Sequence, residues 1–424
     1  MSPRADVRGT RLFGIVPLWT RYGGILLWGV VTHALITAVL RLMPAFDALI
    51  FLPEAAIDLL IRYEEVQRWF AGESIYGDDH SANYPPGSYS LLWPLLGWLP
   101  QAPVRGFYAF TVLLSCGLIG AVAVRASCAD RLAEKAFFLV FILPLGATMI
   151  TVWIGQLGLH VTAALLGGAW LLVGDGCDTA TSRQPRSWAR DAVAAALLTT
   201  ALVKPTLSLP LLVVILVLAG GWRPALMTAA LYGLVTLIAA VPQGRSPVTL
   251  AFEWLSREEI MNLPLGSVNV YLWLHWLGFE GSMIPVSLVI LTGVSLWAWR
   301  YRAAPPWLLI GVAALVSRLW IHHRAFDDVL LIIPAIALFQ AAKTFPAANT
   351  TAGKRGIATV APAFLLAVVY VLGHAPYAYL GGEHYGGWLF MEVARTIVWL
   401  AVLGLLMWHV HRSLQARATH GLAA

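Results

Sequence analysis

Long apolar stretches alternate with short polar segments along almost the whole chain. Roughly 20 apolar residues span the hydrocarbon core of a bilayer as a helix, so the spacing of these stretches predicts about twelve membrane helices. The sequence lacks the short alternation of apolar and polar residues that membrane β-strands require. We therefore expect an all-α polytopic membrane protein. The expected helices cover residues 23–42, 106–124, 137–152, 158–173, 192–203, 206–218, 225–241, 285–299, 306–317, 329–341, 357–372 and 388–408.

Composition supports the membrane class, and the motifs that are missing exclude several kinds of enzyme. Of the 424 residues, 59% are hydrophobic and 12% are charged, about half of the roughly 25% charged residues of a soluble protein. The net charge of +6 reflects basic residues in short loops, so it needs no nucleic-acid partner. The sequence contains no GxGxxG, Walker A, GxSxG or HExxH motif. Its three cysteines, Cys116, Cys128 and Cys177, form no even framework, so we expect neither a disulfide nor a zinc site.

The basic loops predict the orientation, because Lys and Arg accumulate on the cytoplasmic side of membrane proteins. With these loops inside, the helices cross alternately, and both termini lie in the cytoplasm of a cell (inner or plasma) membrane. Residues 84–100 must then lie at the outer surface or re-enter without crossing. We expect one membrane domain over residues 1–424, with a cytoplasmic tail (1–22), a first outer loop (44–100), a second outer loop (242–280) and an outer polar cluster (317–328).

The first outer loop contains a predicted interfacial helix, AAIDLLIRYEEVQRWFAGESIYG, whose apolar residues recur at helical spacing. Asp58 stands near the start of this helix, where the helix dipole favours an ionised carboxylate. Two roles remain open for it. Asp commonly caps a helix, and an ionised carboxylate beside a sugar hydroxyl can act as a general base. Arg62, on the same helix, is a candidate for binding or orienting a substrate.

Three further segments carry candidate residues at predicted outer helix ends. In NYPPGSYS, Pro85 restrains Tyr84 to an extended conformation, and Tyr84 could stack on a sugar or prenyl group or be an ordinary interfacial aromatic. In WIGQLGLH, Gln156 follows Gly155 and is a candidate substrate ligand. In VKPTLSLP, Lys204 interrupts an apolar run. Such a lysine either extends to the interface or meets an anion such as a lipid phosphate.

The segment SRLWIHHRAFDDVLLIIP gathers six ionisable residues between two predicted membrane helices: Arg318, His322, His323, Arg324, Asp327 and Asp328. Each would need a partner in a low-dielectric setting. Arg and His donors suit phosphate recognition, and Asp327 could orient a histidine or pair with Arg324. The alternative is a self-satisfied ion-pair cluster that joins helices. The HHxxxDD spacing is not specific for a metal, so we expect none.

Together these motifs resemble glycosyltransferase family 87 of the GT-C superfamily, over most of the chain. In that family an Asp opens a helix in the first outer loop, and four further short motifs follow in a fixed order. The matches here are Asp58 with Ala71-Gly72 and Tyr76, then Tyr84-Pro85-Pro86, Gly155-Gln156, Lys204-Pro205 and His323-Arg324-x-x-Asp327. Glu64 and Glu65 depart from the pattern, since the family is often small and apolar there.

The resemblance implies a GT-C-like fold and a mannosyltransferase-like enzyme with a polyprenyl-phosphate sugar as donor. It implies Asp58 as the catalytic base for inverting transfer to a lipid-linked or glycan acceptor at the outer leaflet, without a cofactor. We expect His322, His323, Arg324 and Lys204 to bind the donor phosphate, and Tyr84, Gln156, Asp327, Arg62 and Arg318 to bind or orient substrate. The competing prediction is a lipid-linked sugar transporter or flippase that holds phosphate in the same basic site without catalysis.

Overall fold

The computed structural model describes residues 15–76, 82–175, 186–261, 269–279, 281–321, 323–344, 352–374 and 385–419, and 82% of them are helical with no strand. The predicted all-α class is thus confirmed. The elements are α1 Ile15–Phe51, α2 Ile57–Phe70, α3 Pro86–Leu96, α4 Gln101–Ala126, α5 Leu132–Val140, α6 Gly146–Ile154, α7 Gly158–Val173, α8 Trp188–Ala201, α9 Pro205–Ala219, α10 Trp222–Gln243, α11 Pro247–Met261, α12 Val270–Trp276, α13 Met283–Arg300, α14 Pro306–Leu319, η2 Ala325–Leu331, α15 Ile332–Thr344, α16 Ala352–His374 and α17 Tyr385–Thr419.

Five helices of the described residues are long and apolar enough to cross a membrane, or six if the bent pair α6–α7 counts as one span. The helical membrane class is therefore supported, but the predicted twelve spans are not confirmed. Several predicted spans are short helices. The 15 residues of α9, for example, extend about 22 Å at 1.5 Å per residue, less than the hydrocarbon thickness of about 30 Å. The five long spans are Gly24–Phe51, Gln101–Ala126, Trp222–Gln243, Ala325–Lys343 and Glu392–Gln415.

The segment predicted as one helix over 137–152 is broken into α5 and α6. Proline has no backbone N–H and clashes with the preceding turn, and Pro144 lies within the break. The hydroxyl of Thr148 donates to the carbonyl of Ile142 at 2.6 Å, so one of the freed acceptors is satisfied. A second break follows directly, where α6 and α7 meet at an angle of 118°.

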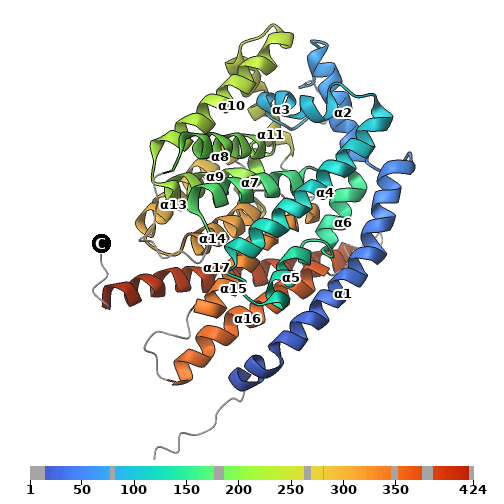
Figure 1. Cartoon of the computed structure of the whole chain (residues 1–424). Coiled ribbons are helices and arrows are strands. Elements are labelled where there is room, and N and C mark those ends of the chain that lie inside the picture. The colour runs from blue at the N-terminus through green and yellow to red at the C-terminus, as the bar shows by residue number, and fades with distance from the viewer. Residues whose placement is uncertain are drawn as a thin grey trace, which may run out of the picture.

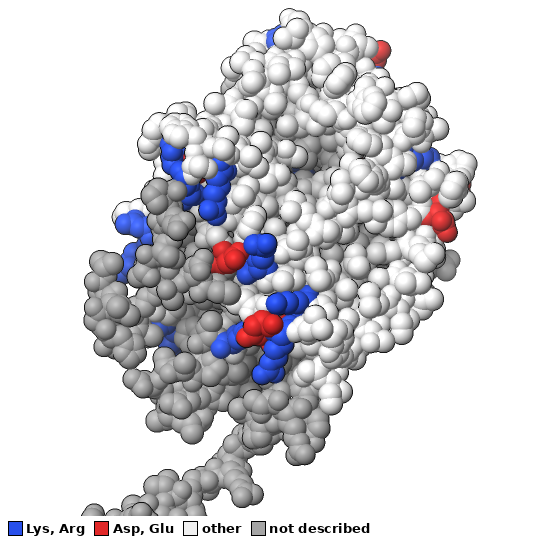
Figure 2. All heavy atoms as spheres, in the orientation of Figure 1, with Lys and Arg blue, Asp and Glu red and all other residues white. Residues whose placement is uncertain are grey.

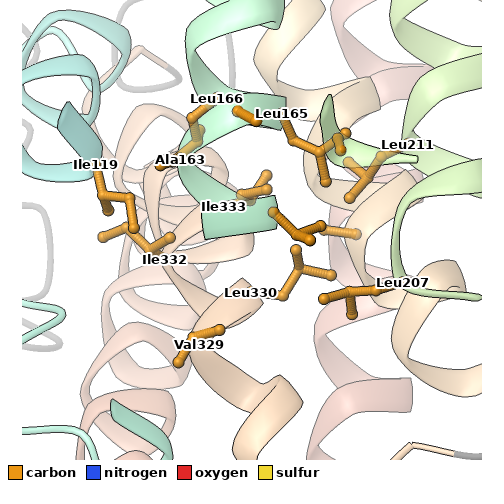
Figure 3. Packing of buried hydrophobic residues seen from close by; sticks show 14 of the residues in the cluster. Ile119, Ala163, Leu165, Leu166, Leu207, Leu211, Val329, Leu330, Ile332 and Ile333 are labelled. Atoms are coloured by element: carbon orange, nitrogen blue, oxygen red, sulfur yellow. The ribbon is translucent and has the colours of Figure 1, made fainter. Parts of the chain in front are cut away.

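Helix α14 lies at the centre of the bundle, in contact with α9, α15 and α17, and nearly all of its side chains are buried. Figure 1 shows α1 along one side of the bundle, while α2, α3 and α11 gather at one end with α10. Around α7 the core is formed by aliphatic side chains of α4, α7, α9, η2 and α15 (Figure 3). Leu165 of α7, Leu207 of α9 and Ile333 of α15 belong to this cluster.

The outer surface is largely apolar. In the view of Figure 2, most of the described surface carries no charge, and the charged side chains gather in a few patches. Large apolar side chains are exposed along the long helices, such as Leu40 of α1, Leu113 of α4 and Val289 of α13. An apolar surface of this extent fits contact with lipid tails better than contact with water.

Basic loops far apart in sequence meet through shared carboxylates. The buried Asp191 of α8 binds Arg186 at 3.0 Å and Arg223 at 3.1 Å, which joins the start of α8 to the start of α10. Lys343, at the end of α15, binds Asp130 at 2.7 Å and Glu134 at 2.8 Å. These ion pairs therefore join helix ends that come from distant parts of the chain.

The cysteines differ from the prediction, because Cys128 is disulfide-bonded. The expectation of no disulfide was wrong, since an odd number of cysteines excludes only complete pairing. Cys116 is buried and free.

We expect Gly311→Ala to lower the free energy of unfolding by about 1–3 kcal/mol, because overpacking a tight contact destabilises by that amount. A Cβ atom at Gly311 would lie 2.5 Å from Cβ of Ala337 and 3.2 Å from a methyl of Leu406. Gly293→Ala is the matched control, since nothing lies within 4 Å of its Cβ position. The midpoint of thermal unfolding in detergent measures both. Equal midpoints for the two variants would contradict the close approach of α14 to α15 and α17.

Candidate functional site

Asp58 lies in the first turn of α2, but it does not cap the helix. The N-cap residue is Ala56, which has a left-handed backbone (φ 60°, ψ 29°). The carboxylate of Asp58 instead accepts a hydrogen bond from Nε2 of Gln156 at 2.5 Å. The contact joins the first outer loop to the bend between α6 and α7, 98 residues further along the chain.

The bend holds Gln156 in place through its backbone. The hydroxyl of Tyr108 donates to the carbonyl of Gln156 at 2.5 Å, so α4 supports the turn. Gly155 has a positive φ of 79°, and a Cβ atom there would lie 2.3 Å from Cβ of Leu59. Only glycine permits this close approach of α2. The side-chain Oε1 of Gln156 is buried and has no hydrogen-bond partner among the described residues.

A second polar group comes from the late cluster and α9. Nζ of Lys204 binds Oδ1 of Asp327 at 2.6 Å, and Nδ1 of His323 lies 3.1 Å from Oδ2 of the same carboxylate. Asp327 therefore joins a lysine and a histidine that are 119 residues apart in sequence. Burial lowers the pKa of His323, and the contact with Asp327 opposes this shift. Nζ of Lys204 also lies 4.8 Å from the ring centroid of Phe326.

The α6–α7 bend brings the two groups to one place. The hydroxyl of Thr151, in α6, donates to the carbonyl of Phe326 at 3.2 Å. A Cβ atom on Gly158, the first residue of α7, would lie 3.4 Å from that carbonyl and 3.9 Å from Oδ1 of Asp327. Gln156, two residues before Gly158, reaches Asp58. One short turn thus contacts the predicted base and the predicted phosphate-binding group.

Tyr84 is buried between these groups. Its ring centroid lies 4.6 Å from the guanidinium carbon of Arg62. Burial raises the pKa of Tyr84, while the positive charges of Lys204 and Arg62 lower it and the carboxylate of Asp58 raises it. The phenol is therefore within electrostatic reach of both halves of the site. The hydroxyl of Tyr76 donates to the carbonyl of Tyr84 at 2.6 Å, which holds this extended segment.

Among the other residues of the late cluster, Arg318 and Asp328 lie apart from this arrangement, whereas the backbone N–H of Arg324 donates to Oδ2 of Asp327 at 3.4 Å. Arg318 is buried and forms an ion pair with Asp328, and its second nitrogen lies 3.9 Å from Glu392 of α17. Glu392 also binds Arg395 at 2.9 Å. These residues match the self-satisfied ion-pair alternative. Arg324 is exposed, and His322 lies outside the described residues, so its predicted phosphate contact stays a prediction.

Sequence reasoning did not assign a role to Glu65. Its side chain is buried and binds Arg62 at 2.5 Å, and burial raises the pKa of Glu65 to about 7, against the opposing charge of Arg62. The signal was present in the spacing, because Arg62 and Glu65 continue the stripe of Leu59, Val66 and Trp69, all of which are buried. Sequence reasoning used their charge and not their position on the buried face.

Within the described residues, no group of three or more His, Cys, Asp or Glu side chains could hold a metal ion. No protein-family model, curated protein or solved structure matches this chain. The fold and site together define a helical membrane protein with two polar groups joined at a broken helix.

We expect Glu65→Gln to flatten the dependence of stability on pH. The pKa of Glu65 is about 7 in the folded protein against an ordinary value of 4.5, so the folded state binds this proton more tightly. The resulting stabilisation is present below the ordinary value and is lost as pH rises through the folded value. The thermal midpoint of the wild type should therefore fall by a few degrees between about pH 5 and about pH 8, and less so in the variant.

The exposed neighbour Glu64 supplies the control, because Glu64→Gln should keep the wild-type slope. A slope that is the same in all three proteins would show that Glu65 takes no proton in this range.

Proposed function

We propose that this protein is an inverting membrane glycosyltransferase that uses a polyprenyl-phosphate sugar as donor. The observation that carries the proposal is the contact of one broken helix with both polar groups. Gln156 at the α6–α7 break binds Asp58, and the adjacent Gly158 lies against Asp327, the partner of Lys204 and His323. A carboxylate base beside a cationic group is the arrangement that transfer from a phosphate leaving group requires.

Asp58 is the proposed general base. Oδ2 is engaged by Gln156, so Oδ1 is the oxygen that takes the proton from the acceptor hydroxyl. As that proton leaves, the acceptor oxygen forms a bond to the anomeric carbon, and the bond from this carbon to the phosphate oxygen breaks. Attack opposite the leaving group inverts the anomeric centre. The buried Oε1 of Gln156 can accept a further hydrogen bond from a sugar hydroxyl, which would orient the substrate.

Lys204 and His323 are the proposed partners of the donor phosphate. Negative charge grows on this phosphate as its bond to the sugar breaks, and cationic donors fixed nearby stabilise it. Asp327 binds both side chains and so orients them before the donor arrives. Arg324 and His322 complete the proposed group. The resemblance to glycosyltransferase family 87 supports mannose as the sugar and a lipid-linked or glycan acceptor. The basic loops support an outward-facing site in a cell membrane.

A transporter or flippase for a lipid-linked sugar is the second candidate, and the bend itself favours it. Many transporters bind substrate at discontinuous helices with polar groups at the break, and α6–α7 is such a helix, bent by 118°. In a transporter, Asp58 and Gln156 would bind the sugar, and Asp58 would not remove a proton from an acceptor.

Asp58→Asn should reduce sugar transfer by about 1,000-fold or more, because the amide cannot accept the proton and general base catalysis contributes about 10²–10⁴-fold. The assay measures radiolabelled mannose transferred from polyprenyl-phosphate mannose to membrane lipid extract by purified protein. Donor binding should persist, since the amide keeps the size of the carboxylate.

Glu64→Gln is the matched carboxylate control on the same helix and should retain activity, since Glu64 is exposed. Full transfer by Asp58→Asn would remove Asp58 from the mechanism. If no form transfers sugar while every form binds the donor and moves it across vesicle membranes, the protein is a transporter.

Donor affinity should fall as pH rises, because a group whose pKa is higher in the complex than in the free protein takes up a proton on binding. Burial lowers the pKa of His323, and a bound phosphate would raise it again, so the complex holds a proton that the free protein releases. Titration of polyprenyl-phosphate mannose at several pH values measures this dependence.

His323→Gln should bind the donor with little pH dependence. His411→Gln changes an exposed histidine of α17 and should behave as the wild type. An unchanged pH dependence in His323→Gln would exclude His323 as the group that takes up the proton.

A further inference from the structure

Arg105, the fifth residue of α4, holds the segment that precedes Asp58. Its guanidinium donates four hydrogen bonds to backbone carbonyls between the end of α1 and the start of α2. Nη1 reaches the carbonyls of Leu49 at 3.3 Å and Leu52 at 2.6 Å. Nη2 reaches those of Pro53 at 3.2 Å and Ala55 at 3.4 Å. The fork thus binds carbonyls at a helix C-terminus, where cations are favoured.

The held segment ends in a strained residue. Ala56 has a positive φ of 60°, a conformation that a side chain disfavours and that persists only where surrounding contacts impose it. Its side chain is fully buried, and its backbone N–H donates to the carbonyl of Trp153 at 2.8 Å. The chain direction at Ala56 sets where α2 begins, and Asp58 follows two residues later.

Three contacts therefore converge on the first turn of α2. Arg105 holds the segment before Ala56, the carbonyl of Trp153 holds Ala56 itself, and Gln156 holds the carboxylate of Asp58. Trp153 and Gln156 both belong to the α6–α7 bend, whereas Arg105 reaches the segment from α4. A rotation at Ala56 would move Asp58 away from Gln156 and break the contact of Ala56 with Trp153.

We propose that Arg105 is a positioning residue, which holds Ala56 in its left-handed conformation and so directs the Asp58 carboxylate toward Gln156 and the substrate. This inference rests on the proposed role of Asp58 as the base. Arg105 touches backbone and not substrate, so its removal should slow the reaction and leave the binding of donor and acceptor nearly unchanged. A lysine offers one point charge in place of the fork, so Arg105→Lys should restore the rate only in part.

The test is a double-mutant cycle between Arg105→Ala and Ala56→Gly in the full chain. Arg105→Ala should lower kcat for transfer from polyprenyl-phosphate mannose by about 100-fold, the loss typical of a reactive group displaced by about 1 Å, with KM within about twofold. Glycine adopts a positive φ without steric conflict. In the Ala56→Gly background, removal of Arg105 should therefore lower kcat only by about tenfold or less.

Hydrogen exchange of the backbone amides supplies a readout that is independent of activity. The amides of Ala56 and Leu60 donate to the carbonyls of Trp153 and Ala56, so their exchange should accelerate in Arg105→Ala. Arg190→Ala is the matched control. Arg190 also donates to a helix-end carbonyl, that of Leu171, but at a distant loop, so its removal should change neither kcat nor exchange over residues 56–60.

The outcomes separate this inference from the proposed function. Equal losses of kcat in both backgrounds, or unchanged exchange over residues 56–60, would show that Arg105 does not hold Ala56. Wild-type activity in Arg105→Ala would also overturn the inference. If Asp58→Asn still loses transfer in that case, the proposed role of Asp58 as the base stands. If Asp58→Asn transfers normally, the proposed base is wrong, and accelerated exchange in Arg105→Ala then shows a purely structural clamp.

Discussion

The bend between α6 and α7 is the constraint on which the site depends. It turns the chain by 118° within a few residues, and glycines at both sides of the turn let other elements approach. Leu59 of α2 packs against Gly155, and Phe326 with Asp327 of η2 packs against Gly158. Gln156, between the two glycines, points its amide at Asp58. A residue with a side chain at either glycine would meet Leu59 or Val329 at 3.2 Å or less, so the bend and its glycines together bring the first outer loop and the late cluster to one turn.

Charges inside this bundle fall into two arrangements with different consequences. Arg318 and Asp328 pair with each other in the interior, where an unpaired ion is costly, and Glu392 extends the network to Arg395 on α17. This network joins helices. Asp327 instead holds Lys204 and His323 next to the bend. The bend itself carries Gln156, whose acceptor atom Oε1 is buried. In the second arrangement Lys204 and His323 share one carboxylate beside the bend that also contacts Asp58, which is why we take it as the candidate site.

Sequence spacing predicted some elements well and others poorly. The expected helix over 106–124 lies within α4, and the interfacial pattern around Asp58 corresponds to α2. The helix expected over 137–152 is two helices, because the apolar pattern continues across Pro144 although the backbone cannot. The sequence singled out the candidate residues Asp58, Gln156, Lys204, His323 and Asp327. Glu65 received no role, because its charge gave no indication that it lies on the buried face of α2.

The sequence by itself determined the all-helical membrane class, since composition and the length of apolar runs depend on no long-range contact. It also singled out most of the polar residues of the candidate site, because polar residues are few in an apolar chain. Only the tertiary structure decided which of them meet. Asp58 contacts Gln156 and not the end of its own helix, Arg318 pairs within the bundle, and Arg105 reaches the carbonyls before Ala56. These contacts join segments brought together by glycine-mediated packing and a broken helix, and no local pattern of residues specifies such distances.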